Sequence, residues 1–294
     1  MKTNIRGVGV ALVTPFNKKA EVDYDALGRL MDHVAEGGVD YLVALGTTAE
    51  TPTLTCDEKS DIVAYIRERN GGRLPLIVGV GGNSTKDVIA AIDKTDLTGV
   101  CGVLSVTPYY NKPSQEGLFQ HYKAVAAESP VPLLLYNVPG RTGVNMCAGT
   151  TLRIANEVDN VLGVKEASGN VAQITEILMH RPENFKVISG DDMLALPIAA
   201  IGGDGVISVA GNAFPALFCR MMECAEKGDY KAASQIHLRV SDAIQALFAE
   251  GNPVGVKGAL AIKGVVENYL RLPLVPCSKE LYASLEKLIG RDVL

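Results

Sequence analysis

The sequence predicts an α/β protein, a closed (β/α)8 TIM barrel with a small C-terminal helical domain. Short apolar runs alternate eight times with stretches of helical periodicity. The segments that follow the apolar runs are also more elaborate than the reverse connections, as expected for active-site loops gathered at one rim of a barrel; they carry GTTAE, TPYYNKP, YNVPGRT, KEASGN, SGDD and AGNAFP. An open doubly wound sheet is the competing arrangement, and it would have fewer strands and a reversal of strand order that a sequence does not display.

Each predicted strand opens a segment that begins apolar and ends in a polar or glycine-containing loop. In chain order these segments are residues 7–16, 41–50, 75–83, 102–113, 131–143, 161–170, 185–192 and 205–212. Eight such segments, each followed by a helical stretch, match the repeat of a closed parallel barrel.

Capping residues delimit the predicted helices. Asp23 precedes the first, Thr55 with Glu58 forms the capping-box pattern of the second, and Ser84 and Ser114 precede the third and fourth. The later helical stretches are residues 147–157, 171–180, 193–201 and 215–227.

Three more helical stretches follow the eighth unit, at residues 230–250, 256–270 and 279–289. Glycine- and proline-containing segments separate them, and no low-complexity linker precedes them. We therefore expect a barrel domain at residues 1–227 and a helical domain at residues 228–294.

Composition and charge argue against several classes of partner. The chain has 294 residues, a formal net charge of −5 and no basic run, which argues against nucleic acid and anionic membranes as partners. No signal peptide and no apolar run long enough to cross a bilayer is visible, so a cytoplasmic protein is expected. Six cysteines without CxxC spacing and four scattered histidines predict reduced thiols and no metal site.

Lys165 is the first candidate catalytic residue. It falls near the end of the sixth apolar run, VLGVKEASGN, and so at the predicted catalytic rim. A lysine amine attacks a carbonyl carbon only when uncharged, and a barrel interior disfavours the charged form. The functional interpretation is a Schiff-base lysine; the structural alternative is a side chain that reaches solvent or pairs with Glu166.

Hydroxyls, phenols and a guanidinium at the same rim could complete a site. Thr47 and Thr48 follow the second strand, and their hydroxyls and backbone N–H groups could hold a carboxylate, although an ordinary turn would look the same. Tyr136 ends the fifth strand and could transfer protons, or could be a core tyrosine. Arg141 could bind a second carboxylate, or be only a solvated charge.

A tyrosine pair follows the fourth strand. Successive strand side chains face opposite ways, so at most one of Tyr109 and Tyr110 is expected to point at the site.

Five motifs together resemble a known family. GTTAE (46–50), TPYYNKP (107–113), YNVPGRTG (136–143), GVKEASGN (163–170) and GVISV (205–209) occur in that order along essentially the whole chain. They resemble the 4-hydroxy-tetrahydrodipicolinate synthase (dihydrodipicolinate synthase) family, within the pyruvate-dependent class I aldolases that also include N-acetylneuraminate lyase. The set of five is specific, whereas any single motif would be weak.

The resemblance implies a Schiff-base-forming carbon–carbon lyase of the condensing type. Its expected substrates are pyruvate and L-aspartate 4-semialdehyde, in lysine and diaminopimelate biosynthesis. No cofactor is implied beyond the covalent imine between pyruvate and a lysine. The implied assembly is a homotetramer built as a pair of tight dimers.

Roles for individual residues also come from the resemblance. Lys165 matches the imine-forming lysine, Tyr136 the proton donor and acceptor, and Thr47 its relay partner. Tyr110 matches the tyrosine that completes the relay of the neighbouring subunit.

Substrate contacts are implied in the same way. Thr48 matches the contact to the pyruvate carboxylate, and Arg141 the residue that receives the carboxylate of the semialdehyde. Gly190 and Ile207 match backbone positions that line the pocket. The Tyr110 and Arg141 matches favour the synthase over a sialic acid lyase.

Regulation is where the sequence departs from lysine-inhibited relatives. Their effector cleft is matched by Asn83 and Tyr109, Asp87 is a shorter version of its acid, and Thr51 is included in the candidate cleft. Two positions that often hold histidine in those relatives differ here, because they are Cys56 and Lys59. A cation at Lys59 would oppose the ammonium groups of lysine by ~1 kcal/mol or more, so weak or absent inhibition is expected.

Two other functions stay open at this stage. One is another pyruvate-dependent aldolase or keto-acid dehydratase with a different acceptor. The other is a barrel without catalysis that binds a metabolite, against which the presence of Lys165, Tyr136 and Thr47 argues.

Overall fold

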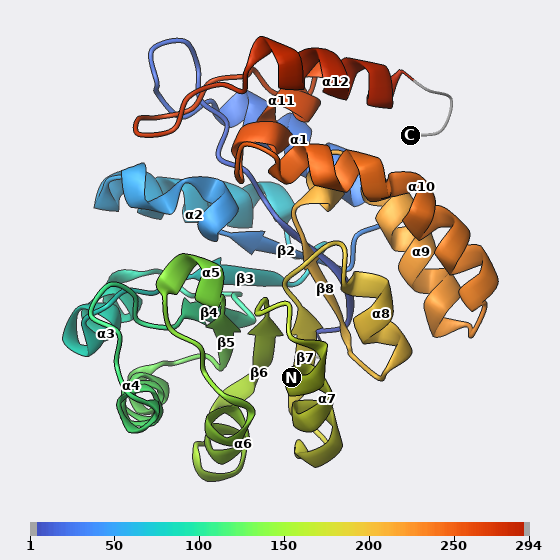
Figure 1. The fold of residues 1–294 in the computed structure, drawn as a ribbon. Coiled ribbons are helices and arrows are strands. Elements are labelled where there is room, and N and C mark those ends of the chain that lie inside the picture. Colours follow the sequence, from blue (N-terminus) through green and yellow to red (C-terminus); the bar gives the residue numbers. More distant parts are fainter. Residues whose placement is uncertain (1–4, 291–294) are drawn as a thin grey trace. The chain divides into compact units, whose positions relative to one another are not determined.

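The computed structural model describes residues 5–290, and its eight parallel strands close into a barrel in chain order (Figure 1). The strands are β1 (Gly7–Ala11), β2 (Tyr41–Ala44), β3 (Leu76–Gly79), β4 (Gly102–Val106), β5 (Leu133–Asn137), β6 (Val161–Glu166), β7 (Lys186–Ser189) and β8 (Gly205–Ser208). The predicted (β/α)8 architecture is confirmed.

Two compact units make up the described chain. The first contains residues 5–6 and 75–207, and so β3 to β7 and most of β8. Its helices are α3 (Thr85–Lys94), α4 (Gln115–Glu128), α5 (Pro139–Thr142), α6 (Ala148–Glu157), α7 (Val171–His180) and α8 (Ala195–Ala200). In this unit α3, α4, α6 and α7 lie outside the strands (Figure 1).

Helix and strand are joined by specific contacts in this unit as well as by apolar packing. The fully buried Tyr122 of α4 donates its hydroxyl to the carbonyl of Ser105 in β4, with an O–O distance of 3.1 Å. A buried phenol needs such an acceptor, because leaving it unpaired costs about 1–3 kcal/mol.

The second unit contains residues 7–74 and 208–290. Its helices are α1 (Tyr24–Glu36), η1 (Thr47–Ala49), η2 (Thr51–Thr53), α2 (Cys56–Asn70), η3 (Ala210–Asn212), α9 (Pro215–Glu226), α10 (Tyr230–Phe248), α11 (Val254–Ile262) and α12 (Lys279–Ile289). Chain segments from the two ends of the sequence therefore share one unit. The division expected at residues 227 and 228 remains a prediction.

The predicted helix starts are confirmed at the atomic level. The Asp23 carboxylate accepts from the backbone N–H of Ala26 at 2.9 Å. Thr55 and Glu58 form both hydrogen bonds of a capping box. Ser84 and Ser114 also cap α3 and α4 with their hydroxyls.

One predicted helix was too long. The expected stretch 256–270 is helical only as α11, which ends at Ile262. Gly264 has a left-handed backbone with φ of 71°, and the next N–H, of Val265, bonds back to the carbonyl of Leu260 at 3.0 Å. A left-handed glycine with this back-bonded carbonyl is a standard helix stop, so apolar spacing beyond it does not continue the helix.

No helix within residues 5–290 is both long enough and apolar enough to span a membrane.

Candidate active site

Neighbouring strands bring Lys165 and Tyr136 together. The two residues are direct partners in the register of β5 and β6, and each is next to the last residue of its strand. The Lys165 Nζ lies 4.2 Å from the centre of the Tyr136 ring. Only 5% of Lys165 and 6% of Tyr136 is exposed, so both side chains are buried where they meet.

The next residue along each strand faces the opposite way. Glu166 and Asn137 are also cross-strand partners, and the Asn137 Nδ2 donates to both Glu166 carboxylate oxygens at 2.9 and 3.2 Å. Gln173, on the outer helix α7, donates to the same carboxylate at 3.0 Å. Because side chains alternate along a strand, Lys165 must point to the inner side of the barrel.

This arrangement contradicts the structural alternative for Lys165. Glu166 accepts hydrogen bonds from Asn137, Gln173 and the backbone N–H of Ser168, at 2.7 Å for the last. Within residues 5–290, Lys165 forms no ion pair with Glu166, and only 5% of Lys165 is exposed, so its side chain does not extend into solvent. The alternative pairing with Glu166 does not form because adjacent strand residues face opposite sides.

Gly190 lies against the side chain of Lys165. A Cβ atom added at Gly190 would lie 3.0 Å from the Lys165 Cε, 3.2 Å from its Cγ and 2.7 Å from the Cβ of Ala167. Its N–H donates to the carbonyl of Glu166 at 2.8 Å, which holds the two chain segments together. A side chain at this position would force the neighbouring atoms to shift. Ile207, the other predicted lining residue, is 1% exposed in β8.

Arg141 lies on α5, the single helical turn that follows β5, rather than in an irregular loop as expected. Its backbone N–H donates to the Val138 carbonyl at 2.9 Å. Beside it, the Thr142 hydroxyl bonds to the carbonyls of Val138 and Val144 at 3.2 and 2.9 Å. The turn is thus held rigidly while the Arg141 residue itself is exposed.

Thr47 and Thr48 belong to the second compact unit, where they form η1. Thr48 is 2% exposed, and its Oγ1 accepts from the Asn252 Nδ2 at 2.9 Å. Thr51 follows in η2 and donates its hydroxyl to the carbonyl of Gly46 at 2.8 Å. The threonines are therefore ordered parts of one short loop.

The tyrosine pair lies at the surface of the single chain. Tyr109 is 40% and Tyr110 88% exposed, and Tyr110 has a left-handed backbone with φ of 72°. Within residues 5–290 Tyr110 makes no side-chain hydrogen bond, so its predicted role stays a prediction about an assembly.

The candidate effector residues are partly exposed. The carbonyl of Asn83 accepts from the Asn111 side chain at 2.8 Å, and Asp87 lies exposed in the first turn of α3. Cys56 begins α2 and is exposed, with Lys59 half-buried one turn on.

The side chains that hold the candidate residues in place were not predicted from the sequence. Strand alternation could have pointed to Asn137 and Glu166, since each directly follows a candidate residue. Nothing local pointed to Asn252, which is 204 residues from Thr48.

A closed parallel barrel with a buried lysine against a tyrosine, at the carboxyl ends of neighbouring strands, defines an enzyme of the class I aldolase type. Comparison with known proteins specifies it further. The model of the Dihydrodipicolinate synthetase family matches residues 4–291, and this chain belongs to that family.

Related sequences and solved structures match this chain over nearly its full length. The chain is 52% identical to the 4-hydroxy-tetrahydrodipicolinate synthase of Parabacteroides distasonis, over 97% of this chain and 96% of the relative. The crystal structure of dihydrodipicolinate synthase from Thermotoga maritima is 41% identical, with a TM-score of 0.95 and 98% of both chains covered. The chloride-inhibited enzyme from Acinetobacter baumannii, complexed with pyruvate, is 38% identical, with a TM-score of 0.94 over 97% of this chain and 98% of that one.

Proposed function

We propose that this chain is a 4-hydroxy-tetrahydrodipicolinate synthase that condenses pyruvate with L-aspartate 4-semialdehyde through an imine on Lys165, in lysine and diaminopimelate biosynthesis. The observation that carries the proposal is the buried Lys165 amine against the Tyr136 ring in a barrel of this family. A carbonyl substrate that enters this space meets a nucleophile and a proton donor together.

The proposed reaction proceeds through an imine and an enamine. The Lys165 amine attacks the ketone carbon of pyruvate, and the resulting carbinolamine loses water to form the imine. Loss of a methyl proton gives an enamine, whose carbon bonds to the aldehyde carbon of the semialdehyde. The amine of the product then attacks the imine carbon, which releases the Lys165 amine and closes the ring.

Proton transfers need a group near the lysine, and Tyr136 is the one the barrel supplies. Its phenol gives a proton to the leaving hydroxyl of the carbinolamine and takes protons back in later steps. Thr47 relays these protons, and Tyr110 serves the relay of a neighbouring subunit. The 88% exposure of Tyr110 in a single chain supports a role across a subunit contact.

Carboxylate recognition is assigned to two places. Thr48 binds the pyruvate carboxylate, and Arg141 binds that of the semialdehyde, for which a guanidinium fork is well suited. Gly190 and Ile207 line the pocket. A metal is not part of this scheme, since the imine itself serves as the electron sink.

We base the proposed oligomeric state and cellular location on the same family. We propose a homotetramer of two tight dimers in the cytoplasm, with no nucleic acid or membrane partner. Lysine inhibits weakly or not at all, because Lys59 places a cation where the effector brings its own positive charge.

Borohydride reduction in the presence of pyruvate tests the proposal. Mass spectrometry of the digested protein should find a three-carbon adduct on Lys165, and a Lys165→Met variant should acquire none. Turnover should then be faster with L-aspartate 4-semialdehyde than with sugar-acid substrates. An unmodified Lys165 would favour a barrel that only binds a metabolite, and an adduct with a different preferred acceptor would favour another aldolase of the superfamily.

A further inference from the structure

The loop that carries Thr47 and Thr48 is bounded by two strained residues. Leu45 and Glu50 both have left-handed backbones, with φ of 53° and 54°. Residues other than glycine seldom adopt this conformation, which is strained and persists only where surrounding contacts impose it. The shape of the loop therefore depends on what holds its two ends.

Glu50 is held by a fully buried ion pair. Its Oε1 accepts from the Lys257 Nζ at 2.5 Å, and both side chains are 0% exposed. Its Oε2 accepts from the backbone N–H of Arg271 at 3.0 Å. The Lys257 amine also donates to the carbonyl of Tyr269 at 3.0 Å and lies 4.2 Å from the centre of the Phe16 ring. All five residues belong to the second compact unit.

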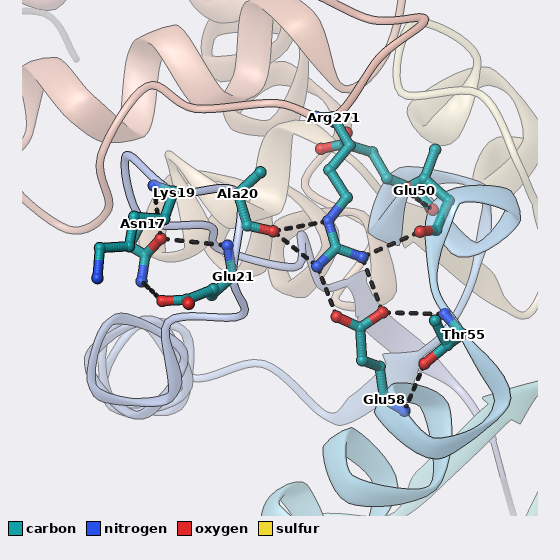
Figure 2. Close-up of polar contacts among 9 residues, drawn as sticks. Asn17, Lys19, Ala20, Glu21, Glu50, Thr55, Glu58 and Arg271 are labelled. Carbon is teal, nitrogen blue, oxygen red and sulfur yellow. Dashed lines mark hydrogen bonds and ion pairs between the residues drawn. The ribbon is translucent and has the colours of Figure 1, made fainter.

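The Arg271 side chain holds the chain just beyond the loop (Figure 2). Its guanidinium forms two hydrogen bonds to the Glu58 carboxylate, at 2.5 and 2.8 Å, and one to the carbonyl of Thr53 at 2.9 Å. A further pair of bonds, at 2.7 and 2.9 Å, reaches the carbonyl of Ala20. Residues 50–58 are thus joined to the C-terminal part of the chain at several points.

Asn252 adds a contact to Thr48 itself. The Asn252 Nδ2 donates to the Thr48 Oγ1 at 2.9 Å, and Asn252 lies two residues before α11, the helix that carries Lys257. One helix and the residue pair before it therefore bond to both Thr48 and Glu50.

Stability alone does not account for a charged pair here. Burial lowers the pKa of Lys257 to about 8, although the attraction of Glu50 acts to raise it. Burial of the charged amine is therefore energetically unfavourable. A buried ion pair can often be replaced by apolar residues at no loss of stability, whereas its bonds have defined directions. A loop with two left-handed residues needs bonds of defined direction to hold its backbone conformation.

We propose that Asn252 and the Lys257–Glu50 ion pair are positioning residues that hold Thr47 and Thr48 in the conformation that binds the carboxylate of pyruvate. The inference rests on the proposed function, because it takes Thr48 as the carboxylate contact. It assigns part of substrate affinity to a helix more than 200 residues away in the sequence.

The test measures how much pyruvate is needed for half-maximal borohydride trapping on Lys165, together with kcat and thermal unfolding. In Lys257→Met the half-saturating pyruvate concentration should rise about tenfold or more, because one partner of a buried pair is lost. Trapping at saturating pyruvate should approach that of the wild type, because lost ground-state binding raises KM rather than lowering kcat. Asn252→Ala should raise the half-saturating concentration about fivefold, the effect of one hydrogen bond.

Two further variants keep the test decisive. Lys227→Met removes the lysine of the exposed Lys227–Glu223 pair at the C-terminal end of α9 and should leave pyruvate saturation unchanged. If Lys257→Met does not fold, the double variant Lys257→Met, Glu50→Gln removes both charges and should fold, yet still need more pyruvate than the wild type.

The pyruvate dependence of these variants distinguishes a positioning role from a merely structural one. Folded Lys257 and Asn252 variants that are less stable but saturate with pyruvate like the wild type would show a merely structural role and overturn the inference. Failure of the wild type itself to form the adduct would instead overturn the proposed function.

Discussion

Substitution of Gly190 by alanine is the sharpest test of how the barrel positions Lys165. The added Cβ would lie 3.0 Å from the Lys165 Cε and 2.7 Å from the Cβ of Ala167. Carbon atoms in contact prefer about 3.5–4.0 Å, so the lysine side chain must move by roughly 0.5–1 Å. A displacement of that size at a reacting group costs about a hundredfold in rate, or about 2.7 kcal/mol in activation free energy.

The rate of borohydride trapping with saturating pyruvate should therefore fall about a hundredfold in Gly190→Ala. Overpacking should also lower the free energy of unfolding, by about 1–3 kcal/mol. Thermal or urea unfolding, measured on the same preparations, separates loss of folded protein from loss of geometry.

Gly149→Ala is the matched control. Gly149 lies in α6, and a Cβ added there would meet no atom within 4 Å. Alanine in a helix is favoured over glycine by about 0.5–1 kcal/mol, so this variant should be slightly more stable and fully active. Wild-type trapping rates in a folded Gly190→Ala protein would refute the steric reasoning.

Three further predictions concern the phenol, a buried histidine and the effector. Tyr136→Phe should keep the fold but slow imine formation by about 10²–10⁴-fold, the range for a lost general acid, as stopped-flow trapping would reveal. Burial lowers the pKa of His121 to about 4, so the unfolded chain binds the extra proton first as pH falls from 6.5. Stability should thus decline between pH 6.5 and 4, by about 2 kcal/mol at pH 5, and urea unfolding of His121→Gln should lack this component. Lysine should not inhibit at low concentration, and half-maximal inhibition below about 1 mM would contradict the reading of Lys59.

Local sequence patterns determined the secondary structure of this protein and where its candidate residues lie along the strands. Alternating apolar runs and helical stretches predicted the eight βα units, and capping residues such as Asp23 and Thr55 predicted helix starts, because these signals act over a few residues. Lys165 and Tyr136 could be placed at the carboxyl ends of their strands for the same reason. The extent of α11 was missed because a left-handed glycine overrides apolar spacing.

Tertiary structure decided which of these residues meet. Strand register, not sequence, set Lys165 against Tyr136 and turned Glu166 to the helices outside. The bonds from Asn252 and Lys257 to the threonine loop join residues more than 200 positions apart. Such contacts form only when the chain closes into a compact unit, so their energy depends on geometry that no local stretch of sequence carries.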